Sequence, residues 1–286
     1  MNEAFDDDGG PQRRALAHVA ARAVGAPLDP TLRVTLNFHP DRAVPGGGTV
    51  LDALAAGGRY VSQFVTGTSN GGLTAHPGGD RWRWESRIFG GAYDAAPAAQ
   101  RPVYGALHFR GGPYGGAPRF GSAHLRLTAE TAARTTFCYP DSFLEPADFG
   151  TAERMGLIEL ALADRQDALD DYVEAQVHGP VRLDRDVEAL VLDPAYRGTP
   201  VEAAARRLPC PLAWHPGFRL TAAALRGHAD YRGPEFVELG ERIAVDGVLD
   251  PAVLGEAARG GAYDPQALKR VWHLLARFGR AGATEG

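Results

Sequence analysis

The sequence has few cysteines and no long apolar run. Only two of its 286 residues are cysteine, Cys138 and Cys210, and they do not form a CxxC pair. This spacing excludes a disulfide framework and a cysteine-based zinc site. No apolar run approaches the roughly 20 residues that a helix needs to cross a bilayer. We therefore expect no membrane span and no membrane partner.

The chain also lacks an excess of positive charge. Lysine and arginine together number 30 against 35 aspartate and glutamate residues, which gives a formal net charge of −5. Nucleic-acid binding through bulk charge requires a basic excess, so we expect no nucleic-acid partner. Residues 1–8 are acidic and lack the pattern of a secretory signal peptide. We expect a protein that stays in the cytoplasm of its producer, or one that enters a host cell without a cleavable signal.

The hydrophobic pattern predicts a sheet-forming core. Residues 31–39 alternate strictly between apolar and polar side chains, which is typical of a strand with one buried face. The remaining strands are expected at residues 60–65, 103–109, 122–127, 135–139, 172–179 and 187–192, the last two being the final strands. The fold class is therefore α+β, with a mostly antiparallel sheet of six or seven strands.

Helices are expected on both sides of this core. They are predicted over residues 11–24, 50–56 and 152–163, and the chain is expected to be helical from Thr199 onward. The residues expected to cap helix N-termini are Thr49, Thr151, Thr199, Asp250 and Asp264. We divide the chain into an N-terminal helical segment (1–30), a core (31–198) and a C-terminal helical subdomain (199–286).

The strand expected at residues 172–179 is the most informative segment. Its alternation places four polar residues on one face, Tyr172, Glu174, Gln176 and His178. An ordinary solvent-exposed strand face explains this pattern equally well. However, these four side chains are also suited to contact a sugar or an amide, so they are candidate binding or catalytic residues.

A second group of candidates follows the strand at residues 31–39. In His39-Pro40-Asp41-Arg42, the guanidinium of Arg42 is a planar fork that fits a phosphate or diphosphate. The alternative is an ion pair between Arg42 and a carboxylate such as Asp41. A metal site could use residues from the set His39, Asp41, His76, Asp80 and His178. None of these has the spacing of a known zinc signature, and we expect no metal.

Glycine-rich segments form a third group. Residues 66–72 and the glycines before Phe120 would let backbone N–H groups approach an anionic ligand. Neither segment is a GxxxxGK[ST] loop or a GxGxxG turn that opens a helix. Loop geometry alone could account for the same glycines. Trp82, Trp84 and Phe89 nearby are expected in the core, with a stacking platform for a ligand as the alternative.

Several of these segments together resemble one bacterial family. They are similar, in order and spacing, to the CteC-like family of bacterial effectors, long catalogued only as a domain of unknown function. The resemblance covers about residues 30–200. It is carried by the segments TLNFHPDR (35–42), YVSQFVTGTSNGGLTA (60–75), RPVYGAL (101–107), RFGS (119–122) and YVEAQVHG (172–179).

This resemblance implies a mono-ADP-ribosyltransferase with a split β-sandwich that grips NAD between two small sheets. The resemblance implies transfer of ADP-ribose to a protein hydroxyl, and it points to a threonine of ubiquitin as the acceptor. The resemblance assigns the catalytic roles to Glu174, Arg42 and Ser122, with Ser69 as a competitor for the serine. Mono-ADP-ribosyltransferases that modify arginine carry Gln or Glu two residues before the catalytic Glu. Here that position is Tyr172, which favours a hydroxyl acceptor.

The implied mechanism follows the charge that develops on NAD. Loss of nicotinamide leaves a cation-like ribose, and a fixed carboxylate at Glu174 would stabilise it. Ser122 would orient Glu174, and Arg42 would hold the diphosphate. The residues expected to contact NAD are Arg42, His39, Thr66, Gly67, Ser69, Asn70, Gly71, Tyr104, Gly105 and Phe120. The residues expected to contact the acceptor are Tyr172, Gln176 and His178.

Three alternatives remain open on the sequence. A close variant is an NAD glycohydrolase, in which water replaces the protein acceptor. A second is a hydrolase of a sugar or phosphate ester that uses Glu174, Asp41 and the histidines. The third is a module that binds a nucleotide or carbohydrate without turnover.

Overall fold

The computed structural model describes residues 10–67 and 74–280. Its centre is one sheet of eight strands, in which every neighbouring pair is antiparallel except β9 and β10. The spatial order is β10 (Leu212–Trp214), β9 (Val187–Leu192), β4 (Ala123–Leu127), β1 (Val34–Phe38), β3 (Val103–Leu107), β7 (Val173–Val177), β5 (Thr135–Tyr139) and β6 (Asp148–Thr151). This confirms the α+β class and a mostly antiparallel sheet, with eight strands instead of the six or seven expected.

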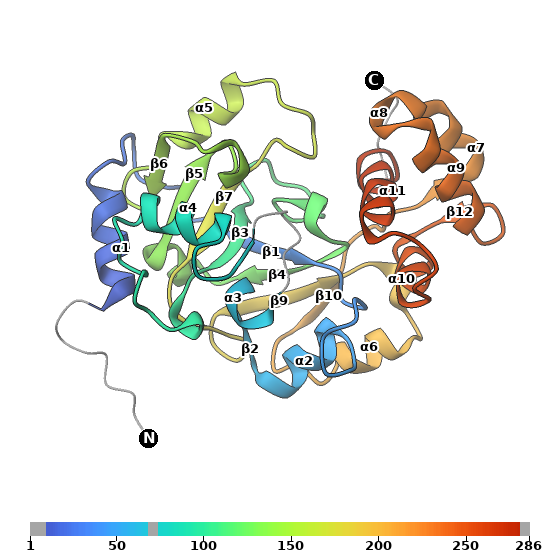
Figure 1. Cartoon of the computed structure of the whole chain (residues 1–286), viewed down its shortest axis with the longest axis horizontal. Coiled ribbons are helices and arrows are strands. Elements are labelled where there is room, and N and C mark those ends of the chain that lie inside the picture. The colour runs from blue at the N-terminus through green and yellow to red at the C-terminus, as the bar shows by residue number, and fades with distance from the viewer. Residues whose placement is uncertain (1–9, 68–73, 281–286) are drawn as a thin grey trace.

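Helices surround this sheet and follow it (Figure 1). Those before residue 210 are α1 (Pro11–Ala20), α2 (Val50–Gly57), α3 (Gln63–Thr66), α4 (Asp80–Ile88), α5 (Leu157–Ala163) and α6 (Pro200–Ala205). Those after it are α7 (Ala222–Leu225), α8 (Ala229–Arg232), α9 (Pro234–Ile243), α10 (Pro251–Arg259) and α11 (Pro265–Phe278). The small strand pairs are β2 (Arg59–Tyr60) with β8 (Val181–Arg182), and β11 (Leu220–Thr221) with β12 (Val248–Leu249).

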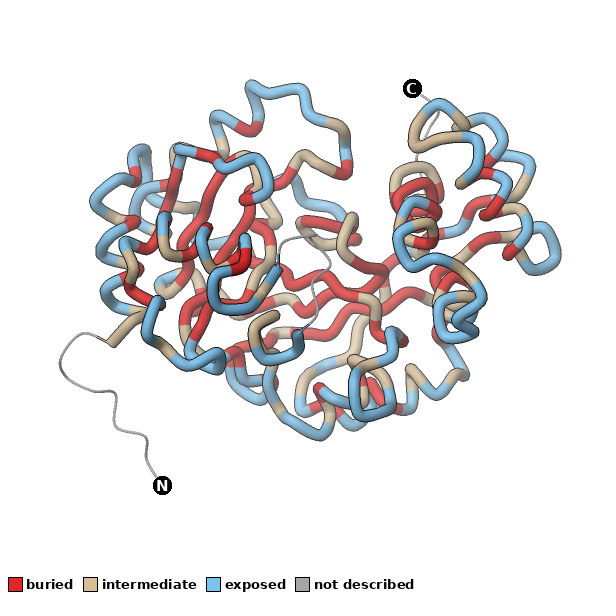
Figure 2. The backbone as a smooth tube through the Cα atoms, viewed as in Figure 1, coloured by how far each residue is buried: buried red, intermediate tan, exposed pale blue. Residues whose placement is uncertain are grey.

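The two faces of the large sheet differ in character. One face is apolar and packs against α2, α5 and α6, as Leu36, Leu125 and Ala175 illustrate. On the other face, the register aligns Thr35 with Ala106 and Ala106 with Glu174. This polar face is also covered, so the strands run through the buried interior (Figure 2). The prediction that the strand at 31–39 has one exposed face is therefore wrong, because every residue of β1 is buried.

Three kinds of segment cover the polar face. Helices α1 and α4 pack over β5 and β6 through a cluster that includes Val19, Trp84 and Cys138. The loop between β3 and β4 lies over Thr35, whose hydroxyl accepts a hydrogen bond from the Gly116 N–H. Helix α11 holds that loop in turn, because its Trp272 indole donates to the carbonyl of Arg119 at 3.0 Å.

The C-terminal helices have a core of their own. They gather at the end of the molecule farthest from α1 (Figure 1), around buried residues such as Phe218, Leu239 and Trp272. Ala204 and Leu208 pack instead into the apolar core of the sheet. Two residues from earlier segments, Tyr114 and Leu169, join the C-terminal cluster. Along the C-terminal part of the chain, the apolar core of these helices therefore begins after residue 199, where the C-terminal subdomain was expected to start.

Several helix caps follow the sequence. Thr49 and Asp52 form the expected capping box at the start of α2. Asp250 accepts from the Val253 N–H and Asp264 from the Ala267 N–H, both at 2.9 Å, and thereby cap α10 and α11. Thr199 differs, because its hydroxyl donates to the carbonyl of Tyr196 and makes no cap bond.

Three other sequence predictions are wrong. The expected strand at residues 60–65 is a short pairing at β2 followed by helix α3. The helix expected at 152–163 begins at Leu157, because Thr151 is the last residue of β6. Residues 187–192 do not form the final strand, since β10 pairs parallel with β9. Within the described residues, no helix has the length and apolarity needed to cross a membrane.

Candidate functional site

A buried carboxylate lies on the polar face of the sheet. Glu174, on β7, is 6% exposed, and its Oε2 accepts hydrogen bonds from the Ser142 hydroxyl at 2.8 Å and the Ser142 N–H at 3.3 Å. Its Oε1 accepts from the Gln176 amide at 3.0 Å. Burial raises the pKa of Glu174, and the nearby Arg81 guanidinium opposes this shift. The carboxyl is therefore oriented by donors from two separate segments.

Ser142 owes its position to a tight turn after β5. It opens the short 3₁₀ helix Ser142–Leu144, whose N-terminus is capped by Asp141 through the Phe143 N–H at 3.0 Å. The Tyr172 hydroxyl donates to the other oxygen of Asp141. Tyr172 thus lies immediately before β7, two residues before Glu174, and holds the turn that carries Ser142.

Helix α4 brings a positively charged side chain, Arg81, near the carboxyl of Glu174. The Arg81 guanidinium donates to the Ser142 hydroxyl at 3.0 Å and stacks 4.0 Å from the centre of the Tyr104 ring. Arg81 is 3% exposed, and its Nε has no hydrogen-bond partner among the described residues. A planar cation thus lies between an aromatic ring and a carboxyl.

A second carboxyl, Glu85, holds α4 on the sheet. It forms an ion pair with Arg101 at 2.7 Å and accepts from the Tyr104 hydroxyl at 3.0 Å. Burial raises the pKa of Glu85 to about 7, although Arg101 and Tyr104 oppose the shift. The Tyr104 ring that contacts Arg81 is therefore fixed from its hydroxyl end.

Gln176 and His178 extend the same network into the sheet. The Thr136 hydroxyl lies 2.9 Å from the Gln176 Oε1 and 3.0 Å from the His178 Nε2. The other ring nitrogen of His178 lies 2.7 Å from the Tyr93 hydroxyl. Burial lowers the pKa of His178 to about 3, so its ring is neutral at pH 7. Both residues were expected to contact an acceptor, but both are buried against protein groups.

The residues after β1 form a different cluster, next to the C-terminal helices. Asp41 is buried and pairs with Arg259 of α10 at 2.9 Å. The His39 ring packs edge-on against Trp272, with ring centres 4.7 Å apart, and burial lowers the pKa of His39 to about 4. Arg42 is exposed. Asp41 thus pairs with Arg259 and not with Arg42, the partner that the sequence suggested as an alternative.

Ser122 belongs to this second cluster as well. Its hydroxyl lies 3.2 Å from the Tyr196 hydroxyl, and its carbonyl lies 2.7 Å from the His215 Nε2. The structure records no hydrogen bond between Ser122 and Glu174, both of which are described. The expectation that Ser122 orients Glu174 is corrected here, because the serine that contacts Glu174 is Ser142.

The other predicted NAD contacts are scattered. Thr66 and Gly67 are exposed at the end of α3, where Gly67 ends the helix with φ 65°. Ser69, Asn70 and Gly71 lie outside the described residues. A Cβ on Gly105 would lie 2.5 Å from the Thr35 carbonyl oxygen, so strand packing alone accounts for this glycine.

Phe120 lies beside the strand that carries Glu174. Its ring contacts the Tyr172 ring edge-on, with centres 5.5 Å apart. The residues considered for a metal do not converge, and no group of three histidine, cysteine, aspartate or glutamate side chains within 10–67 and 74–280 is arranged to hold a metal ion.

A comparison with known protein families identifies the family of this chain. A family model described as "Protein of unknown function (DUF3626)" matches residues 33–166 and 157–278, which together include both clusters. The chain belongs to the DUF3626 family. No curated protein matches it significantly.

The sequence pattern did not identify two residues of this candidate site, Ser142 and Arg81. Ser142 lies 32 residues before Glu174 in a segment without regular periodicity. Arg81 lies in a segment with two tryptophans, which suggested core packing and not a helix that presents a cation. A usable signal for Arg81 was the pattern Arg81-x-x-x-Glu85, because residues four apart share one face of a helix.

Proposed function

We propose that this DUF3626 protein is an NAD-dependent mono-ADP-ribosyltransferase that modifies a protein hydroxyl, with a threonine of ubiquitin as the first acceptor to test. The reaction breaks the bond between the ribose C1′ and the nicotinamide nitrogen, and its electron pair leaves with nicotinamide. A new bond forms between C1′ and the acceptor oxygen, which loses its proton. In this proposal, the eight strands, which form one sheet here, take the place of the two small sheets that the family resemblance implies.

The observation that carries the proposal is the fixed carboxyl of Glu174. Two donors hold Oε2 and one holds Oε1, so the group cannot rotate freely and its charge is directed in advance. Preorganised charge is effective where positive charge develops in the transition state, because no reorganisation is needed during the reaction. A cation-like ribose beside Glu174 would meet this condition.

Glu174 also keeps capacity for one further donor. The second contact to its Oε1 comes from the Cys138 thiol at 3.8 Å, which is long and weak. A ribose hydroxyl that replaced this thiol would gain a hydrogen bond to a carboxylate, which is stronger than a bond to a neutral acceptor. The donor set around Glu174 therefore fits the 2′-hydroxyl of the nicotinamide ribose.

Arg81 and Tyr104 indicate where the nicotinamide ring of NAD could bind. The planar cation of Arg81 stacks on Tyr104 and stabilises the negative charge of Glu174. The oxidised nicotinamide ring is also a planar cation, so it could make the same two contacts. Because Arg81 already lies on the Tyr104 ring, NAD would have to displace it from that ring.

The proposal assigns the positioning of Glu174 to a different serine, and it keeps Arg42 as the residue that holds the diphosphate. Ser142 and Gln176 are positioning residues for Glu174, in the role that the family resemblance gives to Ser122. Arg42 is exposed at the end of β1 and is proposed to hold the diphosphate of NAD. Tyr172 supports Ser142 through Asp141 and is not proposed as an acceptor contact.

The test is intact-mass spectrometry of ubiquitin after incubation with NAD and the full chain. The wild type is expected to add one ADP-ribose, whereas Glu174→Gln adds none. Circular dichroism checks separately that this variant is folded, because a glutamine amide cannot accept from both Ser142 and Gln176. Glu159→Gln, on an exposed residue of α5, is the matched control and is expected to retain activity. Equal modification by Glu174→Gln would exclude this site. Free ADP-ribose without labelled protein would identify a glycohydrolase.

A further inference from the structure

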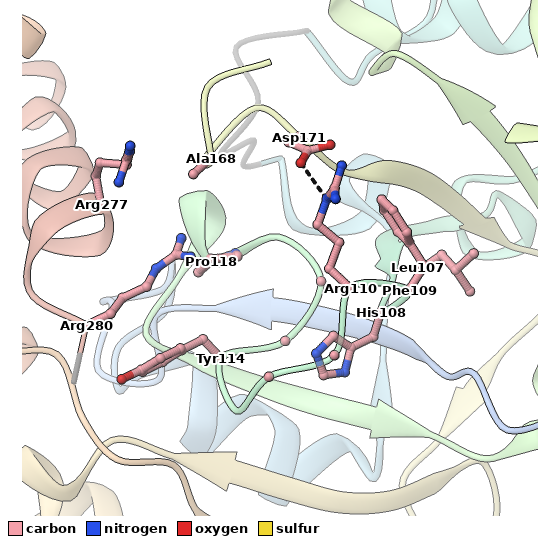
Figure 3. Close-up of a pocket in the computed structure, with 14 residues that line it drawn as sticks. Leu107, His108, Phe109, Arg110, Tyr114, Pro118, Ala168, Asp171, Arg277 and Arg280 are labelled. Carbon is pink, nitrogen blue, oxygen red and sulfur yellow. Dashed lines mark ion pairs between the residues drawn. The ribbon is translucent and has the colours of Figure 1, made fainter. Parts of the chain in front are cut away.

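A cavity of about 380 Å³ is lined by none of the residues assigned to the proposed transferase site. One side is the loop that follows β3, and the other is the C-terminal part of α11 with the residues just after it (Figure 3). The segment before β7 closes a third side through Ala168 and Asp171. The volume is within the range of about 300–1,000 Å³ that is usual for small-molecule sites.

The lining of this cavity is strongly basic. Arg110, Arg277 and Arg280 line it, and Asp171 is the single acidic lining residue within the described chain. Asp171 pairs with Arg110 (Figure 3), and Arg277 pairs at 3.4 Å with Asp167, which does not line the cavity. The three arginines come from two separate parts of the chain, so the fold brings positive charge together here.

Arg280 has no acidic partner among the residues that the structure describes. Within the described residues, no aspartate or glutamate lies within ion-pair distance of it, and its Nη2 is buried without a hydrogen-bond partner. Its Nε donates to the Ala276 carbonyl at 2.7 Å, and its guanidinium lies 5.8 Å from the centre of the Tyr114 ring. A buried N–H without a partner is unfavourable, and a ligand acceptor would satisfy it.

The loop side contributes a second polar atom without a partner. His108 lines the same cavity, and its Nε2 is buried without a hydrogen bond to any described group. Gly111 and Gly112 follow with φ values of 67° and 97°, which lie in the region that favours glycine. No atom lies within 4 Å of a Cβ built on either glycine, so the backbone here is open to a ligand.

We propose that this cavity binds the diphosphate group of a phosphorylated small molecule. Guanidinium groups match phosphate oxygens with paired donors, and three of them converge here with a net positive lining. Two sources share this chemistry: a second NAD molecule, distinct from the one whose diphosphate Arg42 is proposed to hold, and another phosphorylated ligand. The proposal extends beyond the transferase function, because none of these residues has a role in it.

The direct test is calorimetric titration of the full chain with inorganic diphosphate at low ionic strength, where charge pairs are least screened. Saturable binding is expected, and Arg280→Gln is expected to weaken it at least tenfold, as for the loss of a hydrogen bond to a charged group. Arg242→Gln, on an exposed arginine of α9 without a recorded ion pair, is the matched control and should bind as the wild type does.

Two further variants keep the test valid if Arg280→Gln does not fold. The side chains of Arg110 and Arg277 are 42% and 37% exposed, so Arg110→Gln and Arg277→Gln should fold and should also weaken binding. Competition between diphosphate and NAD would identify NAD as the source, and independent binding would identify a separate ligand. Absence of saturable binding would overturn the proposal. Binding that Arg42→Gln abolishes and these variants leave intact would overturn it as well.

Discussion

The hydroxyl of Ser142 lies 2.8 Å from the Oε2 of Glu174, and the Ser142 N–H contacts the same oxygen at 3.3 Å. One residue therefore directs two donors at one carboxylate oxygen. Since the Gln176 amide holds the other oxygen, the carboxyl plane is fixed from both ends. Ser142 is thus the residue whose loss should most directly disturb the orientation of Glu174.

Replacing Ser142 by alanine should lower kcat/KM for NAD by about 10- to 100-fold, because a hydrogen bond to a charged group contributes about 1.5–3 kcal/mol. The measurement is the initial rate of ADP-ribose transfer across a range of NAD concentrations. Ser122→Ala is the comparison variant, and it should stay within about twofold of the wild type, because Ser122 contacts Tyr196 instead. The reverse ranking would restore Ser122 as the residue that orients Glu174.

The pH dependence of kcat/KM should report the titration of Glu174. Burial raises its pKa, and only the ionised form stabilises a developing cation. Activity should therefore be lost as the pH falls through this raised pKa, at a higher pH than for an exposed glutamate. The measurement is the acid limb of the kcat/KM profile. An acid limb at or below the usual glutamate pKa of about 4.3 would contradict the role of Glu174.

Arg81→Gln should move that acid limb to higher pH. The charge of Arg81 is the largest effect that lowers the pKa of Glu174, so its removal leaves the effect of burial less opposed. The same profile measured on this variant provides the test. Arg83→Gln, on the exposed side of the same helix, should leave the acid limb in place. A shift of the limb toward lower pH would contradict the electrostatic effect of Arg81 on Glu174.

Gly105→Ala should destabilise the fold without NAD present. The added Cβ would lie 2.5 Å from both the Thr35 carbonyl oxygen and the Leu36 side chain, where β1 and β3 approach closely. Overpacking of this kind costs about 1–3 kcal/mol. Gly57→Ala, at the end of α2 with open space around it, should instead stabilise by about 0.4–1 kcal/mol. Urea unfolding measures both values, and equal stability of the two variants would contradict the close packing at Gly105.

Local patterns in the sequence predicted much of the sheet and several helix starts. The alternation at residues 172–179 places Glu174 and Gln176 on one face of β7, and Asp250 and Asp264 do cap their helices. These features depend on neighbours within a few residues, so a single segment is enough to predict them. The fold class follows from the same local patterns.

Contacts between distant segments could not be predicted in this way. The alternation at β7 does not tell whether its polar face is solvated, and only the packing of α4 and the loop after β3 shows that it is buried. The contact of Ser142 with Glu174 depends on the pairing of β5 with β7, a tertiary relationship that leaves no signal near either residue. Residues 60–65 were too few to separate a strand from the short helix α3 by periodicity.

The most direct test of Glu174 as the catalytic carboxylate is the release of nicotinamide from NAD, measured in the presence of ubiquitin for the wild type and Glu174→Gln. The wild type should release nicotinamide, and the variant should be slower by about 100-fold or more, as expected when a preorganised electrostatic group is removed. Release at the same rate by both proteins would contradict the role of Glu174 in the reaction.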